Sequence, residues 1–336
     1  MMESWRKIEV CSMFNAITDV KGIKVGHASN FEGYTGCTVI LCEDGATGGI
    51  DVRGSAAGTR QTDSLQSQHL VEEVHAVLLS GGSAFGLNAA GGVMKYLEEK
   101  GIGFPTSVAK VPIVPTAIIY DLSFGDHTIR PTEEMGYEAC KCAESGQVKE
   151  GSIGVGTGAT VGKVFSTECA MKGGFGTASR ALQNGLVVGA AVAVNAFGDV
   201  VNDENGQILA GARDSENGPG IVNSFERIKE GITSREEFFQ NTTLGVVATN
   251  ALLTKRQAIK VSQMAHTGFA KTISPIHLTS DGDLVITLSM RQVQADMNVI
   301  GLLAQETIAE AVKRAIMAAD GFGIIPAYKD SACAVK

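Results

Sequence analysis

The feature that most constrains this chain is an abrupt change from polar to apolar residues between Asn241 and Thr242. A polar, charged segment ends at Asn241, and a short run with the composition of a buried strand begins at Thr242. A cut of the backbone between these two residues would place a new N-terminus at the head of that strand. The hydroxyl of Thr242 and its own α-amine would then lie within one residue of each other.

This layout is that of an N-terminal nucleophile, in which the α-amine acts as general base for the neighbouring hydroxyl. The amine suits this role because its ordinary pKa is about 7.7–8.0. The chain could also cut itself, since the Thr242 hydroxyl can attack the Asn241 carbonyl through a five-membered ring and water can then split the ester. Two alternatives remain at this position: a threonine that merely starts a strand, and a glycosylation triplet over residues 241–243, which matters only in a secreted protein.

The length of 336 residues suits one large domain or two ordinary ones, and a hydrophobic content of 44% is enough for a sizeable core. Expected strands form hairpins with helices between them rather than a strict β–α–β alternation, which favours an α+β fold or a layered sandwich in which helices cover the sheets. The expected helices and hairpins are listed here: helices at about 84–100, 131–145, 254–267 and 295–320, a hairpin of strands 34–42 and 50–53, and a hairpin around 280–283.

The charge pattern and the cysteines restrict the partners and the compartment. The net charge is −8 and no run of Lys and Arg forms a patch, so we expect no nucleic-acid partner. The most apolar window, residues 76–94, is interrupted by glycines, and residues 1–20 lack a signal-peptide pattern, so we expect neither a membrane span nor export. Seven scattered cysteines indicate reduced thiols in a cytoplasmic protein, and no His or Cys spacing indicates a metal or cofactor.

A glycine-rich stretch, residues 151–163, is reminiscent of a nucleotide-binding loop. The P-loop pattern fails because Thr157 stands where a glycine is needed and Val164 follows the lysine where Ser or Thr is required. We therefore interpret these glycines as close backbone packing, and a phosphate-binding module stays open as an alternative. Lys163 is the one charge in this stretch, either an ordinary surface lysine or part of a site.

Four further residues are candidates for chemistry. Asn195 ends a long apolar run, either as a turn former or as an amide donor to a developing oxyanion. Asp281 and Asp283 predict a tight hairpin, and two carboxylates this close would also share protons if buried. Tyr120 ends an extended segment and is either a core tyrosine or a site residue.

Together these segments resemble the β-peptidyl aminopeptidase family, which includes L-aminopeptidase/D-esterases and 6-aminohexanoate (nylon) oligomer hydrolases. The resemblance covers roughly residues 16–328 and rests jointly on several motifs. The motifs are Val-Pro-Ile-Val-Pro at 111–115, Gly-Thr-Gly-Ala-Thr-Val-Gly-Lys at 156–163, Val-Asn-Ala-Phe-Gly-Asp at 194–199 and Asn-Thr-Thr-Leu-Gly-Val-Val-Ala-Thr-Asn at 241–250. Thr242 stands where many members have serine, and the pair Asp281 and Asp283 is more similar to the nylon-oligomer hydrolase branch than to the β-aminopeptidases.

The resemblance implies a single large domain with a four-layer αββα sandwich, shared with ornithine acetyltransferases. It implies self-cleavage into chains 1–241 and 242–336, assembly into homo-oligomers, with a tetramer favoured, and small peptides or amino-acid oligomers as substrates. By the same resemblance Thr242 is the nucleophile and Asn195 an oxyanion donor. Lys163 and Tyr120 contact the nucleophile or the transition state, and Asp281 and Asp283 orient the Thr242 amine and hydroxyl.

Two rival functions remain open on the sequence. An acyltransferase would use the same nucleophile but pass the acyl group to an amine instead of water. A non-catalytic nucleotide- or phosphate-binding module would use the loop at residues 151–163. The family's aminopeptidase members also hold the free amine of the substrate with an acidic residue, and no residue of this chain is assigned to that role.

Overall fold

The computed structural model describes residues 13–216, 218, 220–231 and 241–330. They form a mixed α/β domain built on one large sheet, whose strand order is β10-β11-β14-β16-β2-β4-β7-β3, with β1 paired to β2. The strands of this sheet are β1 (Lys24–Asn30), β2 (Thr35–Val52), β3 (Thr59–Arg60), β4 (Glu73–Ser80), β7 (Thr116–Ile118), β10 (Gly174–Ala181), β11 (Val187–Asn195), β14 (Thr242–Ala251) and β16 (Leu284–Val293).

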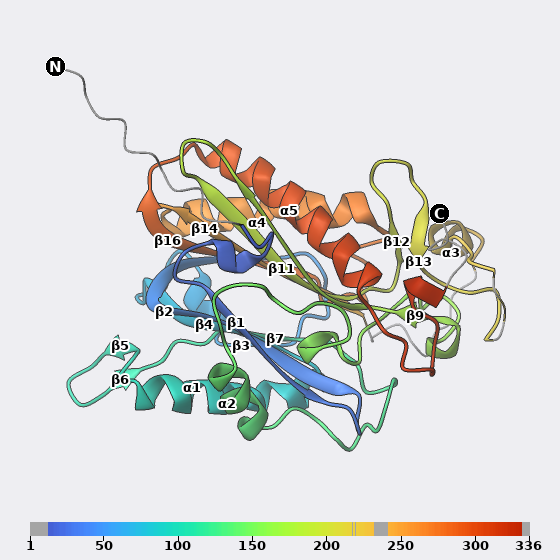
Figure 1. Ribbon diagram of the computed structural model, residues 1–336, viewed down its shortest axis with the longest axis horizontal. Coiled ribbons are helices and arrows are strands. Elements are labelled where there is room, and N and C mark those ends of the chain that lie inside the picture. The colour runs from blue at the N-terminus through green and yellow to red at the C-terminus, as the bar shows by residue number, and fades with distance from the viewer. Residues whose placement is uncertain (1–12, 217, 219, 232–240, 331–336) are drawn as a thin grey trace.

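Helices cover this sheet from two opposite sides, as Figure 1 shows for the pair α4 and α5 and the pair α1 and α2. The helices are α1 (Ala90–Glu99), α2 (Glu133–Lys141), α3 (Ser224–Lys229), α4 (Lys255–Thr272) and α5 (Met297–Met317). The 3₁₀ helices are η1 (Ile17–Asp19), η2 (Thr62–Leu65), η3 (Ser83–Ala89), η4 (Gly154–Gly156), η5 (Thr167–Cys169) and η6 (Tyr328–Asp330). The small sheets contain β5 (Phe104–Pro105), β6 (Lys110–Val111), β8 (Thr160–Val161), β9 (Met171–Lys172), β12 (Asp199–Val201), β13 (Ile208–Ala210) and β15 (Ile273–Ser274).

The helix predictions are confirmed in place, with shifted ends. Helix α4 begins behind a capping box, in which the Thr254 side chain accepts from Gln257 N and Gln257 reaches back to Thr254. It continues to Thr272, beyond the predicted end at residue 267, and its Gly268 lets α5 approach closely. A Cβ on Gly268 would lie 2.5 Å from the carbonyl oxygen of Gln305. The segment predicted as one helix at 84–100 instead starts with η3 and becomes α-helical at Ala90.

Both predicted hairpins are wrong. Residues 35–52 form the single long strand β2, which pairs with β4 in its first part and with β16 in its second. The predicted turn is a register shift between Leu41 and Ala46, with Gly45 at φ +80°, so the glycine bends the strand instead of reversing it. The segment around Asp281 does not join a hairpin either, because β15 pairs with β12 while β16 pairs with β14 and β2.

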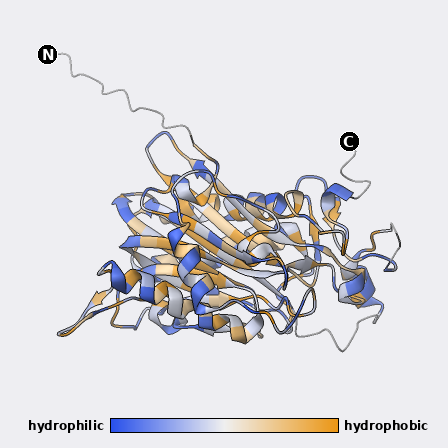
Figure 2. Ribbon diagram, turned by 60° about the horizontal axis from the view of Figure 1, so that its bottom comes forward, coloured by the Kyte–Doolittle hydropathy of each residue, from blue (hydrophilic) through white to orange (hydrophobic). Residues whose placement is uncertain are grey.

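Alternating side chains of the strands divide the interior into separate cores, since successive residues of a strand face opposite sides. On β14, Leu244 and Val246 pack in a central core with Ile40 of β2 and Val77 of β4, whereas Val247 faces the core under α4 and α5. A third core lies between α1, α2 and the outer face of β2 and β4. Figure 2 shows the hydrophobic colouring of the central strands.

Within the described ranges, no helix combines the length and the apolar character that crossing a membrane requires. Five cysteines of these ranges, Cys37, Cys42, Cys140, Cys142 and Cys169, carry free thiols. The described residues also contain no group of three or more His, Cys, Asp or Glu side chains that could hold a metal ion.

The packing of α4 on the sheet gives a stability prediction. Phe269 of α4 is fully buried in the core shared with α5, whereas Phe225 of α3 is 45% exposed. We expect Phe269→Ala to lower the free energy of unfolding by about 3–5 kcal/mol, because it removes buried apolar surface and leaves a cavity. The matched Phe225→Ala should change it by no more than about 0.5 kcal/mol. Urea unfolding followed by circular dichroism measures both, and equal effects would contradict the assigned packing.

Candidate active site

Strand pairing brings the candidate residues to one end of the sheet. Strand β14 begins at Thr242 and lies between β11, which is antiparallel to it, and β16, which is parallel to it. Antiparallel pairing places Asn195, the last residue of β11, directly opposite Thr242. Parallel pairing aligns Leu244 with Leu284, so the residues that precede β16 lie beside the start of β14. Three sequence segments thus meet at Thr242.

The hydroxyl of Thr242 lies against the bond that was predicted to be cut. Its Oγ1 donates to the carbonyl oxygen of Asn241 at 2.5 Å. The backbone N–H of Gly282 donates to the same oxygen at 2.9 Å. The Gly282 backbone also runs close to the hydroxyl, since a Cβ there would lie 2.7 Å from Thr242 Oγ1. In an attack on Asn241 the Thr242 oxygen would bond to the carbonyl carbon, so the Gly282 N–H is the donor that would stay on the oxygen that becomes negative.

The two aspartates occupy different environments. Asp283 Oδ1 accepts from the Thr243 N–H at 2.6 Å, which ties the carboxylate to the strand of the candidate nucleophile. Asp281 forms an isolated parallel bridge with Asn241, and its Oδ2 accepts from Leu278 N at 2.9 Å. Burial raises the pKa of Asp281 to about 7, the nearby charge of Asp283 adds to this rise, and the Leu278 hydrogen bond and Lys163 oppose it. Burial therefore favours the neutral form of Asp281 over its charged form.

Lys163 is not a surface lysine, because it is only 1% exposed. Its Nζ donates to the backbone oxygen of Asn195 at 3.1 Å and to the side-chain Oδ1 at 3.0 Å. The Thr160 N–H donates to the same Oδ1 at 3.0 Å, while Asn195 Nδ2 donates to the carbonyl oxygen of Tyr120 at 3.0 Å. These contacts fix which end of the amide is oxygen, so Nδ2 is held as a donor.

Tyr120 thus belongs to the site neighbourhood through its backbone carbonyl. The contact of its side chain with the nucleophile stays a prediction. The next residue, Asp121, anchors this segment, because its buried carboxyl accepts from Thr35 Oγ1 at 2.7 Å and from the Gly82 N–H at 2.6 Å. Burial raises the pKa of Asp121 to about 6 against the lowering effect of these hydrogen bonds.

The glycines of residues 151–163 serve close packing, as interpreted from the sequence. A Cβ on Gly156 would lie 2.4 Å from the carbonyl oxygen of Gly151, and one on Gly162 would lie 2.0 Å from Ala212 N. Lys163, at the end of this stretch, is directed to the oxygens of Asn195. The stretch therefore places Lys163 in the buried candidate site. It does not form a phosphate-binding loop at the surface.

Two residues of the site were missed by the sequence analysis. Gly282 falls within the predicted tight hairpin, but its N–H donates to the Asn241 carbonyl oxygen. His277 belongs to no motif of the sequence, yet its Nδ1 lies 3.0 Å from Asp283 Oδ2. No local pattern marks either residue, because each contact depends on how the segment before β16 folds back on itself.

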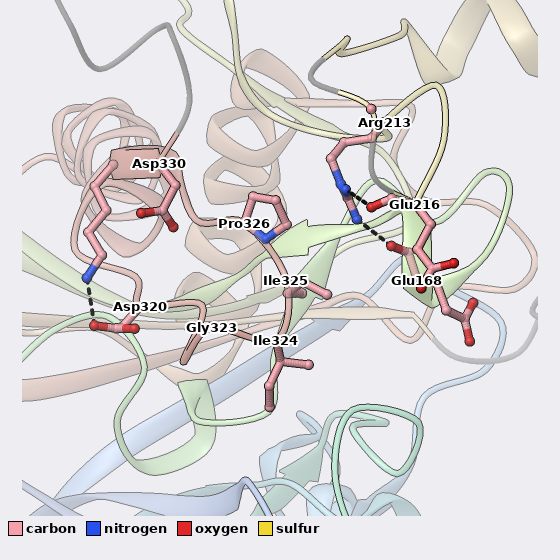
Figure 3. A pocket seen from close by; sticks show the side chains of 11 residues that line it. Glu168, Arg213, Glu216, Asp320, Gly323, Ile324, Ile325, Pro326 and Asp330 are labelled. Carbon is pink, nitrogen blue, oxygen red and sulfur yellow. Dashed lines mark hydrogen bonds and ion pairs between the residues drawn. The ribbon is translucent and has the colours of Figure 1, made fainter.

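A cavity of about 800 Å³ is lined by none of the candidate residues (Figure 3). Its lining consists of Glu168, Arg213, Glu216, Gly218, Asp320, Gly323, Ile324, Ile325, Pro326, Lys329 and Asp330. The guanidinium of Arg213 binds the backbone oxygens of Glu168 and Glu216, and Lys329 pairs with Asp320 at 2.6 Å. Because both of these cations already have partners in the wall, the cavity is not an evident site for an anion.

Comparisons with known proteins identify relatives over nearly the whole chain. A family model described as peptidase family S58 matches residues 15–324. An uncharacterized aminopeptidase of Mycobacterium leprae (strain TN) is 39% identical over 356 aligned positions, covering 96% of this chain and 95% of the relative. A 6-aminohexanoate-oligomer endohydrolase of Agromyces sp. (strain KY5R) is 28% identical over 313 positions, covering 88% of this chain and 84% of that enzyme.

A solved structure shares the fold. The L-aminopeptidase D-Ala-esterase/amidase from Ochrobactrum anthropi, described as a new variant among the Ntn hydrolase fold, matches with a TM-score of 0.67. The match covers 91% of this chain and 87% of that protein, at 20% sequence identity. At this identity the match shows a shared architecture and assigns no residue a role.

The raised pKa of Asp281 gives a prediction for the stability of the uncut chain. The ordinary pKa is 3.8 and the folded value is about 7, so the folded state holds a proton that the unfolded chain releases between these values. The contribution of this group to stability is complete below the lower value and is lost as the pH rises through the upper one. In a Thr242→Val background, Asp281→Asn should therefore reduce the fall in unfolding free energy between about pH 5 and pH 7.5.

Urea unfolding at the two pH values measures this effect. The control is Asp44→Asn at an exposed position. An unchanged pH dependence in Asp281→Asn would contradict the assigned protonation of the pair.

Proposed function

Because this chain belongs to peptidase family S58, we propose that it is a self-processing hydrolase of peptide or amide bonds whose nucleophile is Thr242. Family membership makes the chain a hydrolase of peptide or amide bonds, and it favours this function over the acyltransferase and the nucleotide-binding module that the sequence left open. The nucleophile, the cut and the roles of the other residues are our proposal. The observation that carries it is the contact of Thr242 Oγ1 with the Asn241 carbonyl group, whose oxygen also accepts a hydrogen bond from the Gly282 N–H.

The first reaction is the self-cleavage between Asn241 and Thr242. Thr242 Oγ1 attacks the Asn241 carbonyl carbon, the peptide C–N bond breaks, and the hydroxyl proton ends on the freed amine. The Gly282 N–H, 2.9 Å from the carbonyl oxygen, stabilises the negative charge that develops there. Water then splits the ester, which leaves a carboxylate on Asn241 and the free amine and hydroxyl on Thr242. The products are chains 1–241 and 242–336.

The uncut site is closed, and the cut opens it. Thr242 is 3% exposed and Asn241 is 2% exposed, so a substrate carbonyl has no room beside the hydroxyl before processing. Within the described residues, the buried side-chain amide of Asn241 has no hydrogen-bond partner. A buried polar group without partners costs about 1–3 kcal/mol. That cost favours departure of Asn241 once the bond is broken.

In the mature enzyme the same groups act on a substrate. The α-amine of Thr242 accepts the hydroxyl proton as Oγ1 attacks the substrate carbonyl, and it returns that proton to the leaving amine. Asn195 Nδ2 donates to the oxyanion, and Lys163 with the Thr160 N–H keeps the amide in that orientation by holding Oδ1. Asp283, bound to the Thr243 N–H, orients the head of β14. Water finally hydrolyses the acyl-enzyme ester.

The substrate class and the assembly are further parts of the proposal. Small peptides and amino-acid oligomers suit the family, and the 6-aminohexanoate-oligomer relative supports an oligomer of amino acids. We propose a homo-oligomer, with a tetramer favoured, in the cytoplasm, the latter supported by the free thiols among the described cysteines. We also propose a four-layer αββα sandwich of the ornithine acetyltransferase type, supported by the three cores between helices and strands.

The mass of the purified protein tests the cut directly. Wild-type protein should give two fragments, with the second beginning at Thr242, and it should hydrolyse amides. Thr242→Val should stay intact and lose hydrolysis by about 10³-fold or more, because the nucleophile is gone. The matched control is Thr243→Val, which changes the adjacent buried threonine of the same strand and should still be cut. An intact, inactive wild type that behaves like Thr242→Val would refute the proposal.

A second prediction concerns the space beside the nucleophile. Gly282→Ala places a methyl group 2.7 Å from Thr242 Oγ1. The hydroxyl must then move, and a misplacement of about 1 Å costs on the order of 10²-fold in rate. Self-cleavage, followed by electrophoresis after rapid purification, should slow accordingly, while the unfolding midpoint of the intact chain serves as the control for folding. Cleavage at the wild-type rate would remove Gly282 from the reaction.

A further inference from the structure

His277 contacts Asp283 through the carboxyl oxygen that Thr243 does not use. It lies in the segment between β15 and β16, in a left-handed backbone conformation with φ +61°. Its Nδ1 is 3.0 Å and its backbone N is 3.1 Å from Asp283 Oδ2. Because Asp283 Oδ1 accepts from the Thr243 N–H at 2.6 Å, this carboxyl has three nitrogen neighbours. Such an environment stabilises the ionised form.

Asp281 has the contrasting environment. It is 2% exposed, and one of its oxygens accepts a single backbone hydrogen bond from Leu278. Its other oxygen, Oδ1, is buried and has no hydrogen-bond partner within the described residues. A buried carboxyl with so few donors is more stable in the neutral form. The pair is therefore asymmetric in its contacts: donors gather on Asp283 and are scarce on Asp281.

The other charged or titratable side chains around His277 do not take its place as a partner of Asp283. The ring of His266, on α4, packs edge-on against it with centroids 4.9 Å apart, and burial lowers the pKa of His266 to about 4, so that ring is neutral. Asp51 of β2 lies beside His266 and pairs with Arg53, the residue that follows the end of β2. The charge of Lys163 acts on Asp281, whose pKa it lowers. Among the described residues, His277 is the basic residue whose side-chain nitrogen contacts the Asp283 carboxyl group.

We propose that His277 is a positioning residue that keeps Asp283 ionised and thereby leaves the proton of the acid pair on Asp281. This inference rests on the proposed function, since it specifies how the pair serves Thr242. An ionised Asp283 holds the Thr243 N–H and attracts the ammonium form of the Thr242 amine, whereas a neutral Asp281 does not repel Asp283. Without His277 the two carboxyl groups compete for one proton, and Asp283 is protonated in a fraction of the molecules.

The test uses two substitutions of His277 and one control. His277→Asn keeps a side-chain N–H donor and tolerates the left-handed backbone, but it cannot carry a charge. His277→Ala removes the donor as well. His127→Asn makes the same change at an exposed histidine outside the candidate site. All three are made in wild-type protein for kinetics and in Thr242→Val protein for spectroscopy.

Carbon-13 NMR of labelled aspartate carboxyls follows the titration of the pair in the uncut Thr242→Val protein. Asp281→Asn and Asp283→Asn assign the two signals. We expect His277→Ala to move the Asp283 midpoint up by about one pH unit, because a stabilising neighbour of the carboxylate is lost. His277→Asn should give a smaller shift in the same direction, and His127→Asn none. An unshifted midpoint in both His277 variants would overturn the proposal.

The pH profile of kcat/KM for amide hydrolysis tests the same point in the active enzyme. Its acidic limb should move to higher pH in the His277 variants and stay in place in His127→Asn. A uniform loss of rate with a fixed limb would mean that His277 only supports the local structure, which contradicts the proposal. If wild type is neither cut nor active, the proposed function fails, but the titration in Thr242→Val protein still decides the role of His277.

Discussion

The pairing of β14 with its two neighbours is the constraint on which the site depends. Its antiparallel register with β11 sets Asn195 opposite Thr242, and its parallel register with β16 brings Asp281 and Asp283 alongside. A shift of either register by one residue would turn every side chain of the strand to the opposite face. The shift is prevented because both faces of β14 are buried against different cores. The packing of the whole domain therefore holds the geometry of the candidate site.

Burial gives these groups their chemical character. Lys163, Asp281 and Asp283 are each almost fully buried, and a charge in such a place is costly unless its neighbours compensate. Lys163 is compensated by the oxygens of Asn195, and Asp283 by the N–H groups of Thr243 and His277. Asp281 receives only the N–H of Leu278, and burial raises its pKa to about 7, with the nearby charge of Asp283 adding to the rise. Two neighbouring and chemically identical side chains thus differ in their hydrogen-bond partners.

Much of the site could be predicted because its signals are local. The polar-to-apolar change located the head of β14 at Thr242, and the end of an apolar run located Asn195 at the end of β11. The long helices were predicted from apolar periodicity and capping residues. The long strand β2 was missed because a Glu-Asp-Gly turn signal can also be satisfied by a bulge when both flanking segments find partners in one sheet. The burial of Lys163 and the contact of His277 with Asp283 could not be predicted, since both depend on segments that only the folded chain brings together.

The position of the Asn241–Thr242 bond has a consequence for the refolding of the protein. In the intact chain, β14 and β16 belong to the same polypeptide as β11 and β2, the strands that flank them. A molecule cut there keeps the same sheet but becomes a complex of two polypeptides that share one core. If it were fully denatured, recovery would require the two pieces to meet in solution and would depend on their concentration. Cleavage at this bond would create a reactive N-terminus. The cut, active protein could then no longer refold as a single chain after denaturation.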